Sequence, residues 1–498
     1  MLKLIPLICG LFGLLLAFSF FSWTTRVNGK NKADYKTVAL NNDLFHRDDW
    51  TTIILTIIVL SVAIGIFVGW FACGLYAYGA IVSLLIEFIG SRIIARGRTE
   101  LSIVQDNTVA FRISHRVGVA TGLFMTSFGL LAIGAIFIPF KLSTAVTAIS
   151  CYGFGTSTVV LFNRTRFKPI EDLYESFVET IVATILLSSL AVSTSHITST
   201  FNNRTAAIFP LLIAGIGILA SVIGSFFVRG RDRSWKGLHI NLCIIVSAVV
   251  ISVAAVFLGY NMLQSYAYGV ALLIGIVLGI LTAICSTRKM ITIPAVLFAI
   301  AIIVPYTFIG LYGIALSALG FVSITAVLVS INAFGIVSDK HTSIVNLGNG
   351  YSTCASVLAV LAMFIAYTYV AGLDSISIMT PTVLAGLLVG VTLPLVYVTT
   401  YAKNIDGNDY SFFIDMTAIL IPLLVGLFLG VETLGGLLGG LVTSGMITSF
   451  IVNNLGVKLA KENSYDVVSA INALIKNITI IALVFAPVFI EFGGLISN

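Results

Sequence analysis

Residues 206–228 read AAIFPLLIAGIGILASVIGSFFV, twenty-three positions without a charged side chain, and Arg229-Gly-Arg-Asp-Arg233 follows directly. A bilayer helix needs about 20 predominantly apolar residues. A cluster of basic residues just beyond such a run is typical of its cytoplasmic end. The stretch therefore predicts a transmembrane helix whose C-terminal end faces the cytoplasm.

The same pattern recurs along all 498 residues. With 58% hydrophobic and only 10% charged residues, the composition excludes a soluble globular protein. We predict an all-α, polytopic membrane protein with a single transmembrane domain over 1–498 and two longer cytoplasmic connectors, at 24–50 and 92–116. The sixteen candidate spans are 4–23, 51–69, 70–91, 117–140, 143–163, 171–192, 206–228, 238–259, 266–286, 292–313, 314–338, 351–373, 378–401, 414–432, 435–457 and 468–490.

Basic residues fix the sidedness of these spans. Of the 27 Lys and Arg, 23 fall in the odd-numbered connectors, whereas the N-terminus and the even connectors hold only Lys3, Lys141 and Arg204. By the positive-inside rule the odd connectors face the cytoplasm, so both termini of this multi-pass protein are predicted on the opposite side. The net charge of +6 is a topology signal and gives no reason to expect a nucleic-acid partner.

The six cysteines lie in or beside apolar spans at unrelated spacings. Such cysteines are typical of buried small apolar residues, so neither a disulfide framework nor a structural metal site is predicted.

Among the predicted spans, 171–192 contains the clearest group of ionisable residues. Asp172, Glu175, Ser176 and Glu179 share one helical face, and we call these four residues the polar stripe. Asp172 is also explained as an acid near the helix N-terminus. Glu179 lies roughly 12 Å beyond Glu171 at about 1.5 Å per residue, too deep for that explanation. Because ionisable residues inside a span are costly, Glu179 is the strongest functional candidate.

Two basic residues are predicted near the same side of the membrane. Arg164 ends the preceding span, and Lys476 lies about two turns inside the last one, with Asn472 one turn before it. Lys476 could extend its ammonium group to the surface, but pairing with a buried carboxylate is the less costly solution. Cations beside several carboxylates can hold the acids ionised and release one to bind a proton or Na⁺. We therefore predict an ion gate.

These segments resemble the membrane-integral pyrophosphatases, a family that pumps protons or sodium. The resemblance extends over nearly the whole chain, in order. Its motifs are Gly153-Phe-Gly-Thr-Ser-Thr-Val-Val-Leu-Phe-Asn-Arg164, Asp172-Leu-Tyr-Glu-Ser-Phe177, Gly310-Leu-Tyr-Gly-Ile-Ala-Leu316, Asn332-Ala-Phe-Gly335 with Asp339, Gly435-Gly-Leu-Leu-Gly439, Ala473-Leu-Ile-Lys476 and Leu483-Val-Phe-Ala-Pro487.

The resemblance implies sixteen helices in inner and outer rings, with a cytoplasmic site for Mg²⁺ and pyrophosphate above an ion gate. It places the gate's arginine at Arg164, its aspartate at Asp172 and its lysine at Lys476. The family's gate glutamate has two positions, and this chain has acids at both, Glu175 and Glu179. Ser176 and Asn472 are expected to support the gate.

The hydrolytic site that the resemblance implies is reduced. Only seven residues separate Arg164 from Asp172, where the family has long aspartate-rich extensions. Asn332 and Phe334 replace an expected aspartate and tyrosine, so Asp339 is the remaining catalytic candidate. Pyrophosphate hydrolysis uses several Mg²⁺ ions held by carboxylates. The other acids near these helix ends are Glu171, Glu462 and Asp466.

We therefore expect an H⁺ or Na⁺ transporter that keeps the gate and has lost pyrophosphate hydrolysis. Whether it is an enzyme stays open; if active, it would be an inorganic diphosphatase coupled to cation translocation. The alternatives are an active pump with a reduced site and a non-transporting partner of an intact homologue. No cofactor is expected, and Mg²⁺ only if hydrolysis is retained. A homodimer is expected in the bilayer, with a heterodimer as the alternative.

Overall fold

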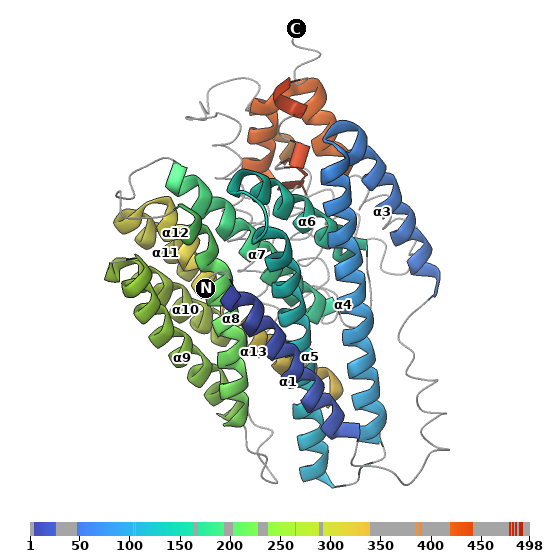
Figure 1. Ribbon diagram of the computed structural model, residues 1–498, viewed down its shortest axis with the longest axis vertical. Helices are drawn as coiled ribbons and strands as arrows, with labels where there is room; N and C mark the ends of the chain where they lie inside the picture. Colours follow the sequence, from blue (N-terminus) through green and yellow to red (C-terminus); the bar gives the residue numbers. More distant parts are fainter. Residues whose placement is uncertain are drawn as a thin grey trace. The chain divides into compact units, whose positions relative to one another are not determined.

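The structure is a computed structural model that describes thirteen parts of the chain (Figure 1). These parts are 4–25, 47–102, 104, 106–162, 168–193, 203–227, 238–263, 265–287, 292–338, 384–386, 388–390, 419–441 and short pieces within 478–491. The described residues are helical throughout, with turns between the helices and no strand among them.

The chain forms two compact units, which are treated separately below. Unit 1 comprises 1–47, 84–140 and 165–355, and unit 2 comprises 48–83, 141–164 and 356–498. Unit 1 contains α1 (Ile5–Thr25), most of α4 (Trp70–Ser102), α5 (Asn107–Phe137), α7 (Lys168–Ser193), α8 (Asn203–Phe226), α9 (Leu238–Leu263), α10 (Tyr266–Thr287), α11 (Thr292–Ile309), α12 (Leu311–Val322) and α13 (Thr325–Val337). Unit 2 contains α3 (Arg47–Phe67), the start of α4, α6 (Leu142–Phe162) and a helix over 419–441.

The helices follow the predicted spans closely from residue 4 to residue 338, except that the span predicted over 314–338 is divided between α12 and α13. Seven helical segments in the described part are long and apolar enough to cross a membrane. The predicted connector at 92–116 is mostly helical, because α4 continues to Ser102 and α5 begins at Asn107. The connector at 24–50 and the spans 351–373 and 378–401 lie wholly or largely outside the described residues, so sixteen spans in two rings stay a prediction.

Glycines with positive φ mark two helix boundaries. Gly69 separates α3 from α4 with φ 129°, as the division between spans 51–69 and 70–91 predicts. Gly310 separates α11 from α12 with φ 71°, three residues before the predicted boundary. A third such glycine, Gly430 with φ 85°, lies inside the helix over 419–441, which continues through the predicted division between 432 and 435. Only glycine adopts this backbone at little cost, so the chain can turn sharply there.

Burial separates inner from outer helices within unit 1. Every described side chain of 173–188 on α7 is buried, and α12 and α13 are buried almost throughout. On α9, by contrast, Val253 and Phe257 are each 66% exposed. Large apolar side chains exposed on a long apolar helix are suited to lipid contact. The chain is therefore a multi-pass integral membrane protein with α7, α12 and α13 in the interior of unit 1.

Glycines allow α5 to approach its neighbours closely. A Cβ on Gly118 or Gly122 would overlap backbone atoms around Ser330 of α13. A Cβ on Gly129 would lie 2.8 Å from the ring of Tyr174 on α7. Small residues at such contacts are how membrane helices pack tightly without a hydrophobic driving force between them. These contacts position α7, which carries Glu175 and Glu179, and α13, which carries Asn332.

Candidate functional site: the polar face of helix α7

Helix α7 begins at Lys168, with Pro169 in its first turn. Proline is tolerated there because the first amide groups of a helix have no intrahelical acceptor. Asp172 therefore lies inside the helix, as predicted, and all four residues of the polar stripe belong to one continuous α-helix. The side chain of Asp172 lies outside the described part of the structure.

The two glutamates of the polar stripe are buried. Glu175 is 1% exposed and Glu179 is fully buried, with Ser176 between them also 1% exposed. Glu175 and Glu179 are one helical turn apart, about 6 Å along the axis. An ionised carboxylate at such a position costs several kcal/mol unless a proton, a metal ion or a basic side chain compensates its charge. The helix thus carries two adjacent acids whose charges need a compensating cation.

Hydroxyl groups continue the polar face deeper into α7. Ser176, Thr180, Thr184 and Ser188 follow one another at intervals of four residues, and we call them the hydroxyl row. All four are at most 1% exposed. The Thr184 hydroxyl donates to the Ile181 carbonyl at 3.0 Å, and the Ser188 hydroxyl donates to the Thr184 carbonyl at 2.6 Å. A hydroxyl that donates to its own helix keeps its oxygen lone pairs available to a proton donor or a cation.

Thr180 differs from its neighbours in the hydroxyl row. Its Oγ1 is buried and has no hydrogen-bond partner among the described residues. A buried hydroxyl without a partner costs about 1–3 kcal/mol. Thr180 is the residue next to Glu179 in the sequence. Its hydroxyl can therefore donate or accept a hydrogen bond close to this acid.

Helix α13, which packs against α7, contributes a second buried polar group. Asn332 is fully buried, and neither its Oδ1 nor its Nδ2 has a hydrogen-bond partner in the described part of the chain. Ser330 faces α5, and two residues at about 100° each place Asn332 roughly on the opposite side of α13. Buried amides are nearly always hydrogen-bonded, so Asn332 is a position at which water or an ion would be stabilised.

The basic half of the predicted ion gate lies outside the described residues. This applies to Arg164, Lys476 and the supporting Asn472, and also to the catalytic candidate Asp339. The structure therefore brings together Glu175, Ser176 and Glu179. The pairing of these acids with Arg164 and Lys476 stays a prediction.

No group of three His, Cys, Asp or Glu that could hold a metal ion occurs among the described residues. Asp339, Glu462 and Asp466 lie outside the described residues. At the position of the expected tyrosine, Phe334 packs its ring against Phe111 with centroids 5.4 Å apart. The residues of α13 in the described part thus offer no carboxylate for the Mg²⁺ ions that the resemblance implies.

Comparison with known proteins identifies the family. The sequence matches the family described as inorganic H⁺ pyrophosphatase over residues 11–166, 169–292 and 280–349. The chain belongs to this family. In the described part of this chain, α7 carries four acids, Glu171, Asp172, Glu175 and Glu179.

Three relatives show the range of the resemblance. A protein of Clostridium tetani described as a K⁺-stimulated pyrophosphate-energised sodium pump is 23% identical, covering 99% of this chain and 98% of the relative. A K⁺-insensitive pyrophosphate-energised proton pump of Methanosarcina mazei is 24% identical, covering 93% and 92%. A K⁺-stimulated pyrophosphate-energised sodium pump of Thermotoga maritima is 20% identical, covering 83% and 84%.

The first of these alignments runs over 672 positions, whereas this chain has 498 residues. The relative therefore contains segments without a counterpart here, although nearly the whole of both chains is aligned. This chain is a shortened member of its family.

Sequence reasoning did not single out Thr180, Thr184 and Ser188. The signal was present, because these residues extend the polar stripe at helical spacing from Ser176. Hydroxyl residues are nevertheless common in membrane helices, so only their complete burial distinguishes them. Asn332 was noted as a replaced aspartate, but its lack of hydrogen-bond partners is visible only in the folded chain.

Proposed function

We propose that this protein translocates H⁺ or Na⁺ across the membrane by way of the polar stripe and does not hydrolyse pyrophosphate. The observation that carries the proposal is the complete burial of Glu179 together with Glu175 on one face of α7. Two such acids in a membrane interior are expensive to maintain for packing alone. Their burial is explained if Glu175 and Glu179 bind the transported cation and release it again.

The proposed path continues beyond the acids. From Ser176 to Ser188 the hydroxyl row covers twelve residues, about 18 Å of helix. Hydroxyl oxygens and the amide of Asn332 can pass hydrogen bonds to water or coordinate a partly dehydrated cation. Arg164, Asp172 and Lys476 are proposed to complete the gate by holding the acids ionised until the ion arrives.

The proposed loss of hydrolysis rests on chemistry that this chain does not supply. Pyrophosphate carries several negative charges and requires Mg²⁺ ions bound through carboxylate oxygens. In place of the aspartate that the resemblance implies, α13 has the neutral Asn332. The seven residues between Arg164 and Asp172 hold a single acid, Glu171.

An active pyrophosphate-energised pump is the second candidate, because the relatives are described as such pumps. If that function holds, Asp339 would be among the carboxylates that bind Mg²⁺. A homodimer is proposed for both functions, and a heterodimer with an intact homologue is the alternative.

Phosphate release separates the two functions. Purified protein in lipid is incubated with Mg²⁺ and pyrophosphate, and orthophosphate is measured over time. We expect no release above that of a sample without protein. Release that disappears in Asp339→Asn would establish the active pump instead.

A further inference from the structure

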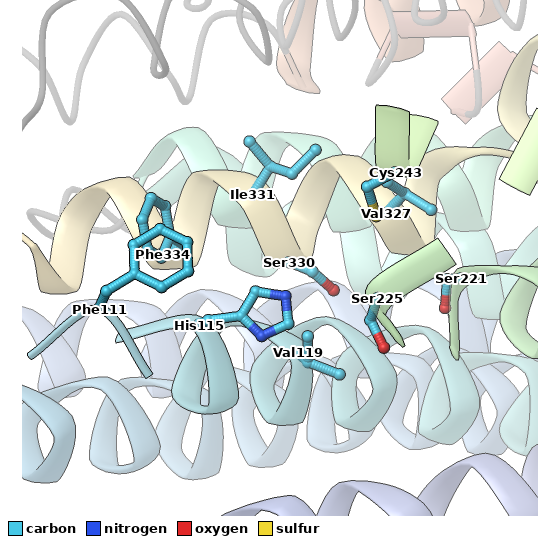
Figure 2. A pocket seen from close by; sticks show the side chains of 10 residues that line it. All are labelled: Phe111, His115, Val119, Ser221, Ser225, Cys243, Val327, Ser330, Ile331 and Phe334. Carbon is cyan, nitrogen blue, oxygen red and sulfur yellow. The ribbon is translucent and has the colours of Figure 1, made fainter. Parts of the chain in front are cut away.

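A small cavity lies between four helices of unit 1, away from the polar stripe. Its walls are formed by α5, α8, α9 and α13, and its volume is about 30 Å³. Figure 2 shows the imidazole of His115 among the hydroxyls of Ser225, Ser221 and Ser330, with Phe111 and Phe334 beside one another. We call this space the α5–α13 cavity.

The three serine hydroxyls all use their hydrogen within their own helix. Ser221 donates to the Ile218 carbonyl, Ser225 to the Val222 carbonyl and Ser330 to the Ala326 carbonyl, each at 2.7 Å. Each hydroxyl oxygen keeps a lone pair that can accept another hydrogen bond. The walls from α8 and α13 therefore present acceptors to the cavity.

His115 supplies the complementary group. A neutral imidazole has one N–H donor and one acceptor nitrogen. The ring lies against Phe111 with centroids 6.3 Å apart. The imidazole thus lines the cavity together with hydroxyl oxygens that can still accept a hydrogen bond.

The cavity has room for water. A water molecule occupies about 10–15 Å³ of such a volume and needs two to four polar partners, whereas a purely apolar cavity of this size stays empty. The α5–α13 cavity has the volume for about two waters, and an imidazole and three hydroxyls are among its mainly apolar lining residues. Its polar groups come from three helices, so a bound water can link them.

We propose that the α5–α13 cavity is a binding site for one or two ordered water molecules that bridge His115 on α5 to Ser330 on α13. The bridge joins helices that already meet closely at Gly118 and Gly122. A water bound to Ser330 would help fix the rotation of α13 about its axis. It would thereby also help orient Asn332, which lies on the same helix. The site shares no residue with the proposed ion path.

Hydroxyl-radical footprinting of the purified full chain tests the proposal. X-ray irradiation labels side chains next to trapped water, even where bulk solvent does not reach. Cys243 lines the cavity and is 5% exposed, whereas the fully buried Cys151 does not line it and serves as the internal control. We expect labelling of Cys243 well above that of Cys151. Equal, near-zero labelling of both thiols would overturn the proposal.

Variants assign the labelling to the bridge. His115→Phe and Ser330→Ala each remove one end, and labelling of Cys243 should fall toward the level of Cys151. Ser114→Ala removes a similar hydroxyl that donates to the Ala110 carbonyl at 3.0 Å outside the cavity, and should change nothing. A cryo-EM map of the wild type should show density within about 3 Å of the imidazole and of Ser330 Oγ. Density that appears only with added Na⁺ or K⁺ would identify a cation site and overturn the water site.

Discussion

The guanidinium group of Arg98 donates two hydrogen bonds to the carbonyl oxygen of Ile336, from Nε at 3.2 Å and from Nη2 at 3.0 Å. Arg98 lies on α4 and Ile336 in the last turn of α13, where carbonyl groups have no intrahelical donor. A cation at a helix C-terminus also compensates the helix dipole. A residue 238 positions earlier thus holds the end of the helix that carries Asn332.

Replacing Arg98 should loosen the end of α13. Hydrogen bonds from a charged donor contribute about 1.5–3 kcal/mol, so Arg98→Ala should speed local amide exchange roughly tenfold or more. Hydrogen exchange of the α13 amides, followed by mass spectrometry, measures the effect. The exposed Arg112 on α5 is the matched control, and Arg112→Ala should leave these amides unchanged. Equal exchange in both variants would show that Arg98 does not stabilise the end of α13.

Adding a methyl group between α5 and α13 should destabilise the protein. In Gly122→Ala the new Cβ would overlap the Ser330 hydroxyl and lie 2.7 Å from the Ala326 carbonyl oxygen. Backbone atoms cannot move aside cheaply, so we expect a loss of about 1–3 kcal/mol in the free energy of unfolding. Thermal unfolding in detergent should therefore begin at a lower temperature.

Gly74→Ala is the control for this substitution. Gly74 lies on α4, and a Cβ there would meet no atom within 4 Å. Because alanine favours a helix by about 1 kcal/mol over glycine, the variant should be as stable as wild type or slightly more stable. A similar loss in both glycine variants would show that α5 and α13 do not meet as described.

The cap of α5 should depend on pH. The Thr108 hydroxyl and the Thr108 backbone N–H both donate to Asp106 Oδ1 at 2.8 Å. These hydrogen bonds, the hydroxyl first, lower the pKa of the Asp106 carboxyl below its usual value of 3.8. A lowered pKa means that the stabilisation is complete above the pKa of the unfolded chain and is lost as the pH falls through the folded-state pKa.

Asp106→Ala should therefore lower the melting temperature at pH 7, and the difference from wild type should shrink as the pH falls below about 4. Melting curves of both proteins across this range measure the change. Thr108→Val, which keeps the backbone donor, should show a smaller loss at pH 7. A difference that stays constant down to low pH would contradict the assignment of the cap to the ionised carboxyl.

The helices of this protein can be predicted from the local sequence, whereas the candidate site can be predicted only in part. Apolar length and basic flanks predict α8 because a bilayer imposes both on a single segment. The polar stripe of α7 is predictable for the same local reason, since four residues on one helix keep their spacing in any fold. Arg98 and Ile336 meet only through the packing of separate helices, as do His115 and Ser330. No spacing in the sequence encodes such contacts.

The ends of the helices could also be predicted from the sequence only in part. The division between α3 and α4 was predicted at Gly69, where a left-handed φ confirms it. The division between α11 and α12 was predicted after residue 313 but occurs at Gly310. Both neighbouring segments are apolar there, so hydropathy alone does not locate the turn. The backbone freedom of Gly310 decides the position.

The role of the deepest acid tests the proposed path. Glu179→Gln keeps the size of the side chain but cannot bind and release a proton, so cation flux should fall by about tenfold or more, a barrier increase of at least about 1.4 kcal/mol. Glu175→Gln should reduce flux as well, because the two acids share one face. Glu87 on α4 is 5% exposed and lies off the polar stripe, so Glu87→Gln should retain flux.

The decisive measurement is cation flux in proteoliposomes containing wild type or Glu179→Gln, in the absence and in the presence of Mg²⁺ and pyrophosphate. We expect H⁺ or Na⁺ flux by the wild type without pyrophosphate, no increase when pyrophosphate is added, and loss of flux in the variant. Flux that requires pyrophosphate, or that persists unchanged in Glu179→Gln, would contradict this expectation.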